Sequence, residues 1–423
     1  MGAKVKKSNS EYSFFLFLIW PFFAALFAIR NYKAVWAKDL IWFFVAFFGF
    51  TLTIVVTDAE EKSDANRYRD KFVEMAAQKV TFENVTSLFY DEESQVLDIL
   101  ESLVIFLVSR VSDNYHVLFA AFGFIFGFFY SRNIWYLIER VQGKMASENV
   151  PILITFAFIV GFWEINGFRF WTATHIFLYG ALPYLFEGKK NKLPFALLAA
   201  FMHFSYLLPL LVLGLHTALG KRTTVYFALF ILTFFVKELN LSQLGDTLAA
   251  NLPEIFLPRV KGYINEDYAT EITEIYAKAN WYVVWYQLAL KWSVTVFIVT
   301  IYFTGKKFLN ANKNFERLFS FTLLLFSVAN IFSLVPSGGR FLSLSNLFAV
   351  AFIFFYIQYA PMSRAIKRII PFAIPALLLY SIVALRIGIE AMGILCLVGN
   401  PLVRIFINAD ITVLELLKGT FKF

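Results

Sequence analysis

The amino-acid sequence predicts an all-α fold, a polytopic bundle of about 12–13 transmembrane helices that forms one integral membrane domain over residues 1–423. Two observations predict it. The chain is 59% hydrophobic and only 16% charged, with a mean hydropathy of +0.65, which is too apolar for the surface of a soluble domain. The apolar residues also fall in runs of roughly 16 to 24, and a helix needs about 20 residues to cross the hydrocarbon core of a bilayer.

The first apolar run follows a basic N-terminus, as in a signal peptide, but it ends in Arg30 and Lys33 and not in a small-residue cleavage site. We therefore expect a retained helix. The spans that the apolar runs predict are 13–29, 39–57, 115–138, 150–165, 168–186, 193–219, 223–238, 281–304, 316–335, 340–360, 370–387 and 391–408.

Basic residues cluster in short connections between these spans, at 30–38, 187–192, 221–222, 306–317 and 363–368. The positive-inside rule places such clusters in the cytoplasm. The long, acidic segments 58–95 and 239–280 are then exterior loops. The apolar segment 94–110 cannot span if the later basic clusters are to stay inside, and charges interrupt it. We expect it to form an amphipathic helix on the outer face.

The segment 193–219 has basic clusters on both sides, so it must leave the cytoplasm and return. It is too short to cross twice. We therefore expect two half-length helices that meet near His203 to Ser205, as in helices that break to bring polar backbone to a buried site. One long helix is the alternative.

Several kinds of chemistry find no support in the sequence. With the single cysteine Cys396, no disulfide and no cysteine metal site can form. The sequence shows no Gly-rich phosphate loop and no metalloprotease or hydrolase motif. The net charge of +8 is explained by the cytoplasmic loops. We expect no cofactor, no metal and no nucleic-acid partner.

Three ionisable residues at the outer ends of helices are candidates for function, because charge near hydrocarbon is expensive. Arg169 follows the polar link 164–167 and opens a helix, and Arg340 follows a Gly-Gly turn that lets backbone approach a ligand. His203, with Ser205 close by, has a side chain suited to general-base work. The alternatives are arginines that extend to lipid headgroups and a histidine that only packs.

The exterior loops add four candidates. Asp64, Arg67 and Tyr68 share one face of a helix at spacings of i, i+3 and i+4, as they would on an ordinary solvated helix. In the second loop, Arg259 lies among tyrosines such as Tyr263, a mixture suited to stacking on sugars.

Three motifs occur in order along the chain: D-x-x-x-Y at 64–68, R-x-x-x-A at 169–173 and A-x-x-x-H-x-S at 199–205. Together with the late Arg340, they resemble the EpsG family, relatives of the Wzy polymerases that join lipid-linked oligosaccharide repeats. The resemblance implies a fold like that of membrane glycosyltransferases of the GT-C type. It also implies an enzyme of the bacterial cytoplasmic membrane that polymerises undecaprenyl-diphosphate-linked repeat units into a capsule, exopolysaccharide or O-antigen at the outer face.

In this hypothesis Arg169 and Arg340 stabilise the leaving diphosphate, because a guanidinium binds two phosphate oxygens at once. His203 is the general base and Asp64 the reserve base. The other substrate-binding candidates are Tyr68, Arg67, Ser205 and Arg259.

The expected partners are the lipid-linked oligosaccharide, membrane lipid, and flippase and chain-length regulator proteins. A lipid-linked oligosaccharide flippase or transporter is the first alternative, and an O-antigen-ligase-like transferase is the second. The sequence does not separate polymerase from ligase.

Overall fold

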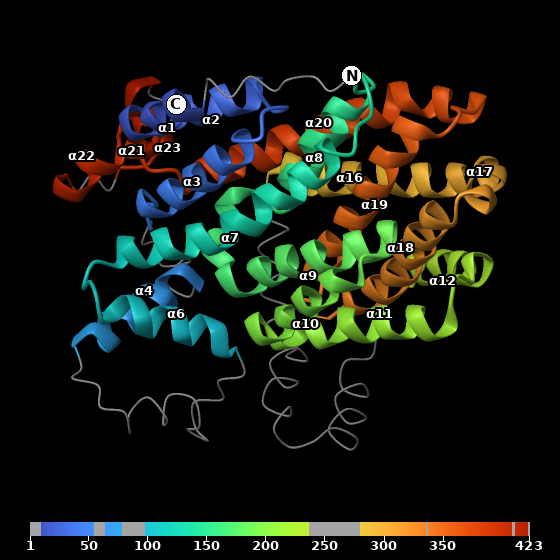
Figure 1. Cartoon of the computed structure of the whole chain (residues 1–423), viewed down its shortest axis with the longest axis horizontal. Coiled ribbons are helices and arrows are strands. Elements are labelled where there is room, and N and C mark those ends of the chain that lie inside the picture. The colour runs from blue at the N-terminus through green and yellow to red at the C-terminus, as the bar shows by residue number, and fades with distance from the viewer. Residues whose placement is uncertain are drawn as a thin grey trace, which may run out of the picture.

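The computed structural model describes residues 10–54, 64–77, 98–236, 280–335, 337–407 and 411–421. These ranges are helical, without a strand apart from two isolated β-bridges, which confirms the all-α prediction (Figure 1). The helices are α1 (Ser10–Ile19), α2 (Pro21–Arg30), α3 (Ala37–Phe50), α4 (Asp64–Ala77), α6 (Ile99–Ser109), α7 (Tyr115–Ile138), α8 (Asn149–Ile159), η2 (Phe162–Gly167), α9 (Phe168–Glu187), η3 (Lys190–Lys192), α10 (Leu193–Met202), η4 (Phe204–Tyr206), α11 (Leu207–Leu219), α12 (Thr223–Phe234), α16 (Trp281–Thr304), α17 (Lys306–Ala311), α18 (Lys313–Phe332), α19 (Arg340–Tyr359), α20 (Arg364–Glu390), α21 (Ile394–Val398), α22 (Pro401–Phe406) and α23 (Val413–Phe421).

Six helical segments in the described ranges are long and apolar enough to cross a membrane, so the chain is a multi-pass membrane protein. They are α7, the segment Asn149–Glu187 that contains α8 and α9, α16, α18, α19 and α20. The predicted span 13–29 divides into α1 and α2 at Pro21. The predicted span 391–408 is wrong, because the chain there forms only α21 and α22, which are separated by Gly399 and Asn400 and are five and six residues long.

Helices α3 and α7 pack against each other at very short range. A Cβ atom on Gly49 would lie 2.0 Å from the carbonyl oxygen of Phe119, and one on Gly123 would lie 2.5 Å from that of Val45. Small residues at such positions let membrane helices come close enough for backbone contact. The pair therefore fixes the two ends of the segment that lies between them in the sequence.

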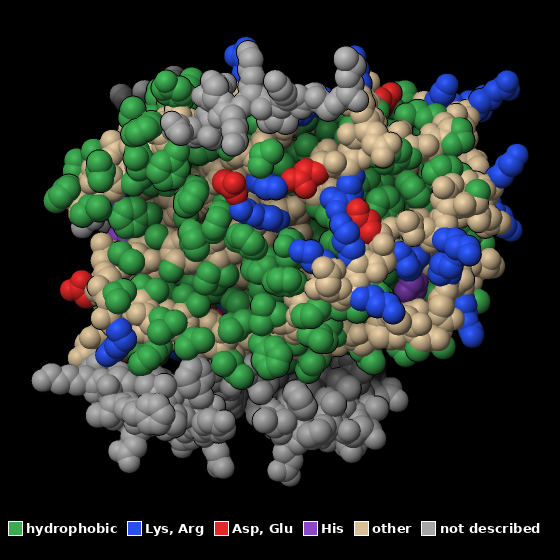
Figure 2. All heavy atoms as spheres, in the orientation of Figure 1, with side chains coloured by type: hydrophobic (Ala, Val, Ile, Leu, Met, Phe, Trp, Pro, Cys, Tyr) green, Lys and Arg blue, Asp and Glu red, His purple; other side chains and the backbone are tan. Residues whose placement is uncertain are grey.

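The basic connections lie together at one end of the bundle, which we call the basic end. Figure 2 shows Lys and Arg side chains gathered toward the side that carries α17. Ion pairs join connections that are far apart in sequence: Lys38 with Glu139 at 2.7 Å, Arg140 with Glu187 at 2.8 Å, and Lys221 with Glu316. The opposite end, where α9 begins and α18 gives way to α19, is called the site end below.

The chain breaks at His203, as predicted from the charge pattern. Helix α10 ends at Met202, His203 is extended at φ −151° and ψ 119°, and α11 begins at Leu207. The His203 ring accepts a hydrogen bond from the backbone N–H of Ser205 and so caps the short turn η4. The prediction of two half-length helices is confirmed, and the break lies at the site end.

Helix α6 occupies the segment predicted as an amphipathic helix. Its buried side chains include Glu101 and Ser102, whereas Leu103 and Leu107 are exposed. The helix is confirmed, and its polar side chains face the protein while apolar ones face outward. This arrangement suits a helix that lies against lipid.

We expect the two ends of the bundle to lie on opposite sides of the membrane. Asp113 and Asn191 are both exposed, Asp113 between α6 and α7 and Asn191 at the basic end. In intact cells Asp113→Cys should react with a thiol reagent that does not cross membranes, and Asn191→Cys should react only after permeabilisation. The native Cys396 is buried and should stay silent. Labelling of Asn191→Cys in intact cells would contradict this orientation.

Candidate functional site

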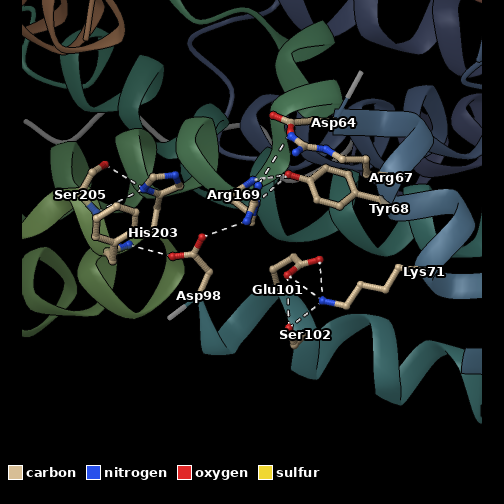
Figure 3. A network of polar contacts seen from close by, with 11 residues as sticks. Asp64, Arg67, Tyr68, Lys71, Asp98, Glu101, Ser102, Arg169, His203 and Ser205 are labelled. Carbon is tan, nitrogen blue, oxygen red and sulfur yellow. Dashed lines mark hydrogen bonds and ion pairs between the residues drawn. The ribbon is translucent and has the colours of Figure 1, made fainter. Parts of the chain in front are cut away.

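The site end brings together residues from four separate parts of the chain (Figure 3). Helix α4 contributes Asp64 and Tyr68, the start of α9 contributes Arg169, and the break between α10 and α11 contributes His203. Asp98, just before α6, joins them. The structure thus places Asp64, Tyr68, Arg169 and His203 near one another at this end of the bundle.

Arg169 is the centre of this network. Its Nη1 is 3.1 Å from Oδ2 of Asp98 and its Nη2 is 3.7 Å from Oδ1 of Asp64. Its Nε–H donates to the Tyr68 hydroxyl at 3.2 Å. Burial raises the pKa of the Tyr68 phenol although Arg169 lowers it, so the hydroxyl keeps its proton. Arg169 is therefore held by protein groups. An arginine that extended to lipid headgroups would not make these contacts.

Asp98 is a residue that the sequence did not reveal. Its side chain is 2% exposed, and while Oδ2 meets Arg169, Oδ1 accepts a hydrogen bond of 2.9 Å from the backbone N–H of Phe204. One carboxylate thus ties the head of α9 to the break beside His203. The only signal in the sequence is an acidic residue directly before an apolar helix.

The imidazole of His203 is buried, with 6% of the residue exposed. The Ser205 hydroxyl lies 2.8 Å from Nδ1, and the Ser205 N–H points to the same nitrogen at 3.3 Å. Because a backbone N–H can only donate, Nδ1 is the unprotonated nitrogen of a neutral ring. The basic lone pair of His203 is therefore directed at Ser205.

Helix α4 is anchored by charge. Arg67 pairs with Asp64, yet 62% of its side chain is exposed. Lys71 reaches α6, where it lies 2.9 Å from the hydroxyl of Ser102. The guanidinium of Arg67 is thus open to contact with a ligand.

Arg340 belongs to a neighbouring site. It follows a tight turn in which Ser337 has φ +60°, and a Cβ on Gly338 would lie 1.7 Å from the carbonyl oxygen of Phe332. Only glycine fits at such an approach. The guanidinium carbon lies 5.6 Å from the centre of the Phe170 ring.

The Phe170 ring contacts residues of both sites. The His203 ring packs against Phe170 with centroids 5.3 Å apart, and Arg340 lies over the same ring. Arg340 also lines a cavity of about 700 Å³ between α8, η2, α9, α12, α16, α18, α19 and α20. The structure thus gathers Arg169 and His203 in one network, and Arg340 contacts the same Phe170 ring as His203.

Two charged residues that line this cavity were assigned no role from the sequence. Glu164 lies in η2, and Lys291 lies within α16. The sequence carries a signal for each, because Glu164 lies in the polar link before Arg169 and Lys291 is a cation inside an apolar run. Arg259 lies outside the described residues. In the described part of the chain no three His, Cys, Asp or Glu side chains are grouped to hold a metal ion.

A family model described as the EpsG family matches residues 40–394. The chain belongs to the EpsG family. The motifs at 64–68, 169–173 and 199–205 all lie within the matched part, so the resemblance seen in the sequence is confirmed. No curated protein and no solved structure matches the chain, and the likeness to GT-C glycosyltransferases stays a prediction. EpsG membership and the spanning helices support a membrane role of the polysaccharide-polymerase type.

Proposed function

We propose that this EpsG protein is a glycosyltransferase that polymerises undecaprenyl-diphosphate-linked oligosaccharide units into a surface polysaccharide, at the outer face of the bacterial cytoplasmic membrane. The observation that carries the proposal is the position of the charged groups. Arg169, His203 and Arg340 all lie at the site end, opposite the basic end. A transferase needs its groups on the face where the substrate is presented, whereas a flippase needs them along a path through both faces.

The leaving diphosphate is the part of the reaction that most needs positive charge. Arg340 is suited to it, because its guanidinium faces a cavity that can hold a ligand. Arg67 is open to the same kind of contact. Arg169 contributes its positive charge from within the network, and its contacts with Asp98 and Tyr68 fix where that charge lies.

His203 is the general base in this proposal, and its geometry routes the proton through Ser205. The acceptor sugar hydroxyl attacks the anomeric carbon of the donor, and its proton passes by way of the Ser205 hydroxyl to Nδ1 of His203. The bond from the anomeric carbon to the diphosphate oxygen breaks, and its electron pair leaves with the diphosphate. Asp64 already accepts a hydrogen bond from Arg67 and forms an ion pair with Arg169 at 3.7 Å, so it is better suited to positioning them.

The proposal implies partners for the rest of the pathway. Lipid-linked units are brought to the outer leaflet by a flippase, and the length of the product is set by a regulator protein. Membrane lipid surrounds the spanning helices, whose exposed side chains include Trp285 and Trp292 of α16.

The test is a reaction of purified components. The protein in detergent, given lipid-linked repeat units alone, should produce a ladder of lengthened products. Neither a nucleotide sugar nor a divalent cation should be needed, so a chelator should leave the ladder unchanged. If the purified protein lengthens no lipid-linked oligosaccharide, the polymerase proposal is wrong, and transfer of finished chains to another acceptor would instead indicate a ligase.

A further inference from the structure

Lys291 is a cation in the hydrocarbon-spanning part of the bundle. It follows Trp281 by ten residues, about 15 Å along α16. A lysine at such a depth is costly unless it pairs or faces a polar space. In the described ranges it forms no ion pair, and its Nζ lies 4.7 Å from the centre of the Phe234 ring. It lines the cavity that contains Arg340.

One further polar group of the cavity has no hydrogen-bond partner in the described part of the chain. Asn346, with 9% of its surface exposed, lines the cavity, and within the described part of the chain its side-chain oxygen is buried without a hydrogen bond. Buried polar atoms of this kind are rare in folded proteins unless a ligand or water completes them. Asn330 and Gln287 line the same space. The cavity is therefore built for a polar ligand.

Three charged residues in the described part of the chain line the cavity. Lys291 and Arg340 come from α16 and from the start of α19, and Glu164 comes from η2. Glu164 lies close enough to Arg340 for their charges to interact. A carboxylate repels phosphate oxygens but accepts hydrogen bonds from sugar hydroxyls. A ligand that carries both a diphosphate and a sugar would thus find groups suited to each part in this cavity.

We propose that Lys291 is a phosphate-binding residue that holds the diphosphate of the lipid-linked substrate together with Arg340, while Glu164 faces the attached sugar. This inference rests on the proposed function, since it names a further residue for the same substrate. The cavity also offers apolar walls for the start of the lipid chain, with Phe230 and Phe326 among its lining. The lysine ammonium is a point charge on a flexible side chain, whereas the planar arginine guanidinium can bind two phosphate oxygens at once. The two side chains can therefore contact different phosphate groups of the diphosphate.

The test measures binding, so that it does not depend on turnover. Undecaprenyl diphosphate is titrated into the purified protein in detergent, and the Kd is read from the fluorescence of tryptophans, of which Trp163 and Trp171 line the cavity. Lys291→Gln should raise this Kd about tenfold or more, the usual effect of losing a contact with a charged group. Lys291→Arg should restore it to within about threefold of the unmodified protein, because it keeps the charge.

Lys306→Gln is the matched control, because Lys306 follows α16 at the basic end and does not line this cavity. Its Kd should not change, and undecaprenol, which has no phosphate, should bind Lys291→Gln and the unmodified protein alike. An unchanged Kd for undecaprenyl diphosphate in Lys291→Gln, or an equal loss for undecaprenol, overturns the proposal. These outcomes are separate from the polymerisation test, since a protein that binds undecaprenyl diphosphate through Lys291 but forms no ladder refutes the polymerase alone.

Discussion

Replacing His203 with alanine should stop chain growth while single repeat units still reach the outer face. The ring's basic nitrogen is directed at Ser205, 2.8 Å away, and its loss leaves the acceptor hydroxyl without a proton acceptor. Removing a general base commonly lowers a rate by about 10² to 10⁴. The measurement is the rate of ladder formation by purified protein, together with analysis of lipid-linked units on each leaflet in cells. Units retained on the inner leaflet would indicate a flippase.

His216→Ala is the matched control for this prediction. His216 is also a buried histidine, on α11 nearer the basic end, and its Nε2 is hydrogen-bonded to Ser320 at 2.8 Å. Its loss disturbs packing but touches nothing at the site end. If both alanine variants lower the rate per folded molecule equally, or if His203→Ala costs less than about threefold, His203 is a packing residue and the base lies elsewhere.

Replacing Asp98 with alanine should destabilise the protein by about 3 kcal/mol, because it removes the nearest anionic partner of Arg169 from a mostly buried ion pair. The change removes the contact with Arg169 at 3.1 Å and the acceptor for the Phe204 N–H at 2.9 Å. Asp98→Asn keeps an oxygen for the N–H and should cost less. The measurement is the free energy of unfolding in mixed micelles.

Asp70→Ala is the control for stability. Asp70 pairs with Arg69 at 2.9 Å, but 66% of its side chain is exposed. Exposed pairs contribute about 0–1 kcal/mol, so this variant should stay close to the unmodified protein. Equal losses for the two aspartates would show that the contacts of Asp98 with α9 and with the α10–α11 break do not stabilise the site.

The break at His203 was predictable and Asp98 was not, for a physical reason. Basic clusters on both sides of 193–219 require both ends of that segment to lie on the same side of the membrane. These clusters are next to the segment in the sequence, so the sequence alone shows the requirement. The partners of Asp98 are Arg169, 71 residues away, and Phe204, 106 residues away. No local spacing records such contacts, and the segment of Asp98 has the composition of an ordinary amphipathic helix.

Helix ends and cavity residues escaped prediction because hydropathy averages over them. The helix in the predicted span 150–165 ends at Ile159, because the backbone of Val160 is not helical. The Val160 carbonyl oxygen lies 3.2 Å from Nε2 of His175 instead. An apolar run continues through this point, so composition does not register the break. Lys291 was concealed in the same manner, since one lysine scarcely alters the mean of a run of 24 residues.

The close contact of α3 with α7 has a consequence for how the site end holds together. Gly49 and Gly123 let α3 and α7 pack closely, and these two helices flank the chain segment that carries α4 and α6. When the contact of Asp64 or Tyr68 with Arg169 breaks, α4 stays at a high effective concentration near Arg169, because α4 belongs to a chain segment that is held at both ends. Contacts that are individually weak, such as the pair of Lys71 with Glu101 at 3.4 Å, therefore suffice to restore α4 to its place.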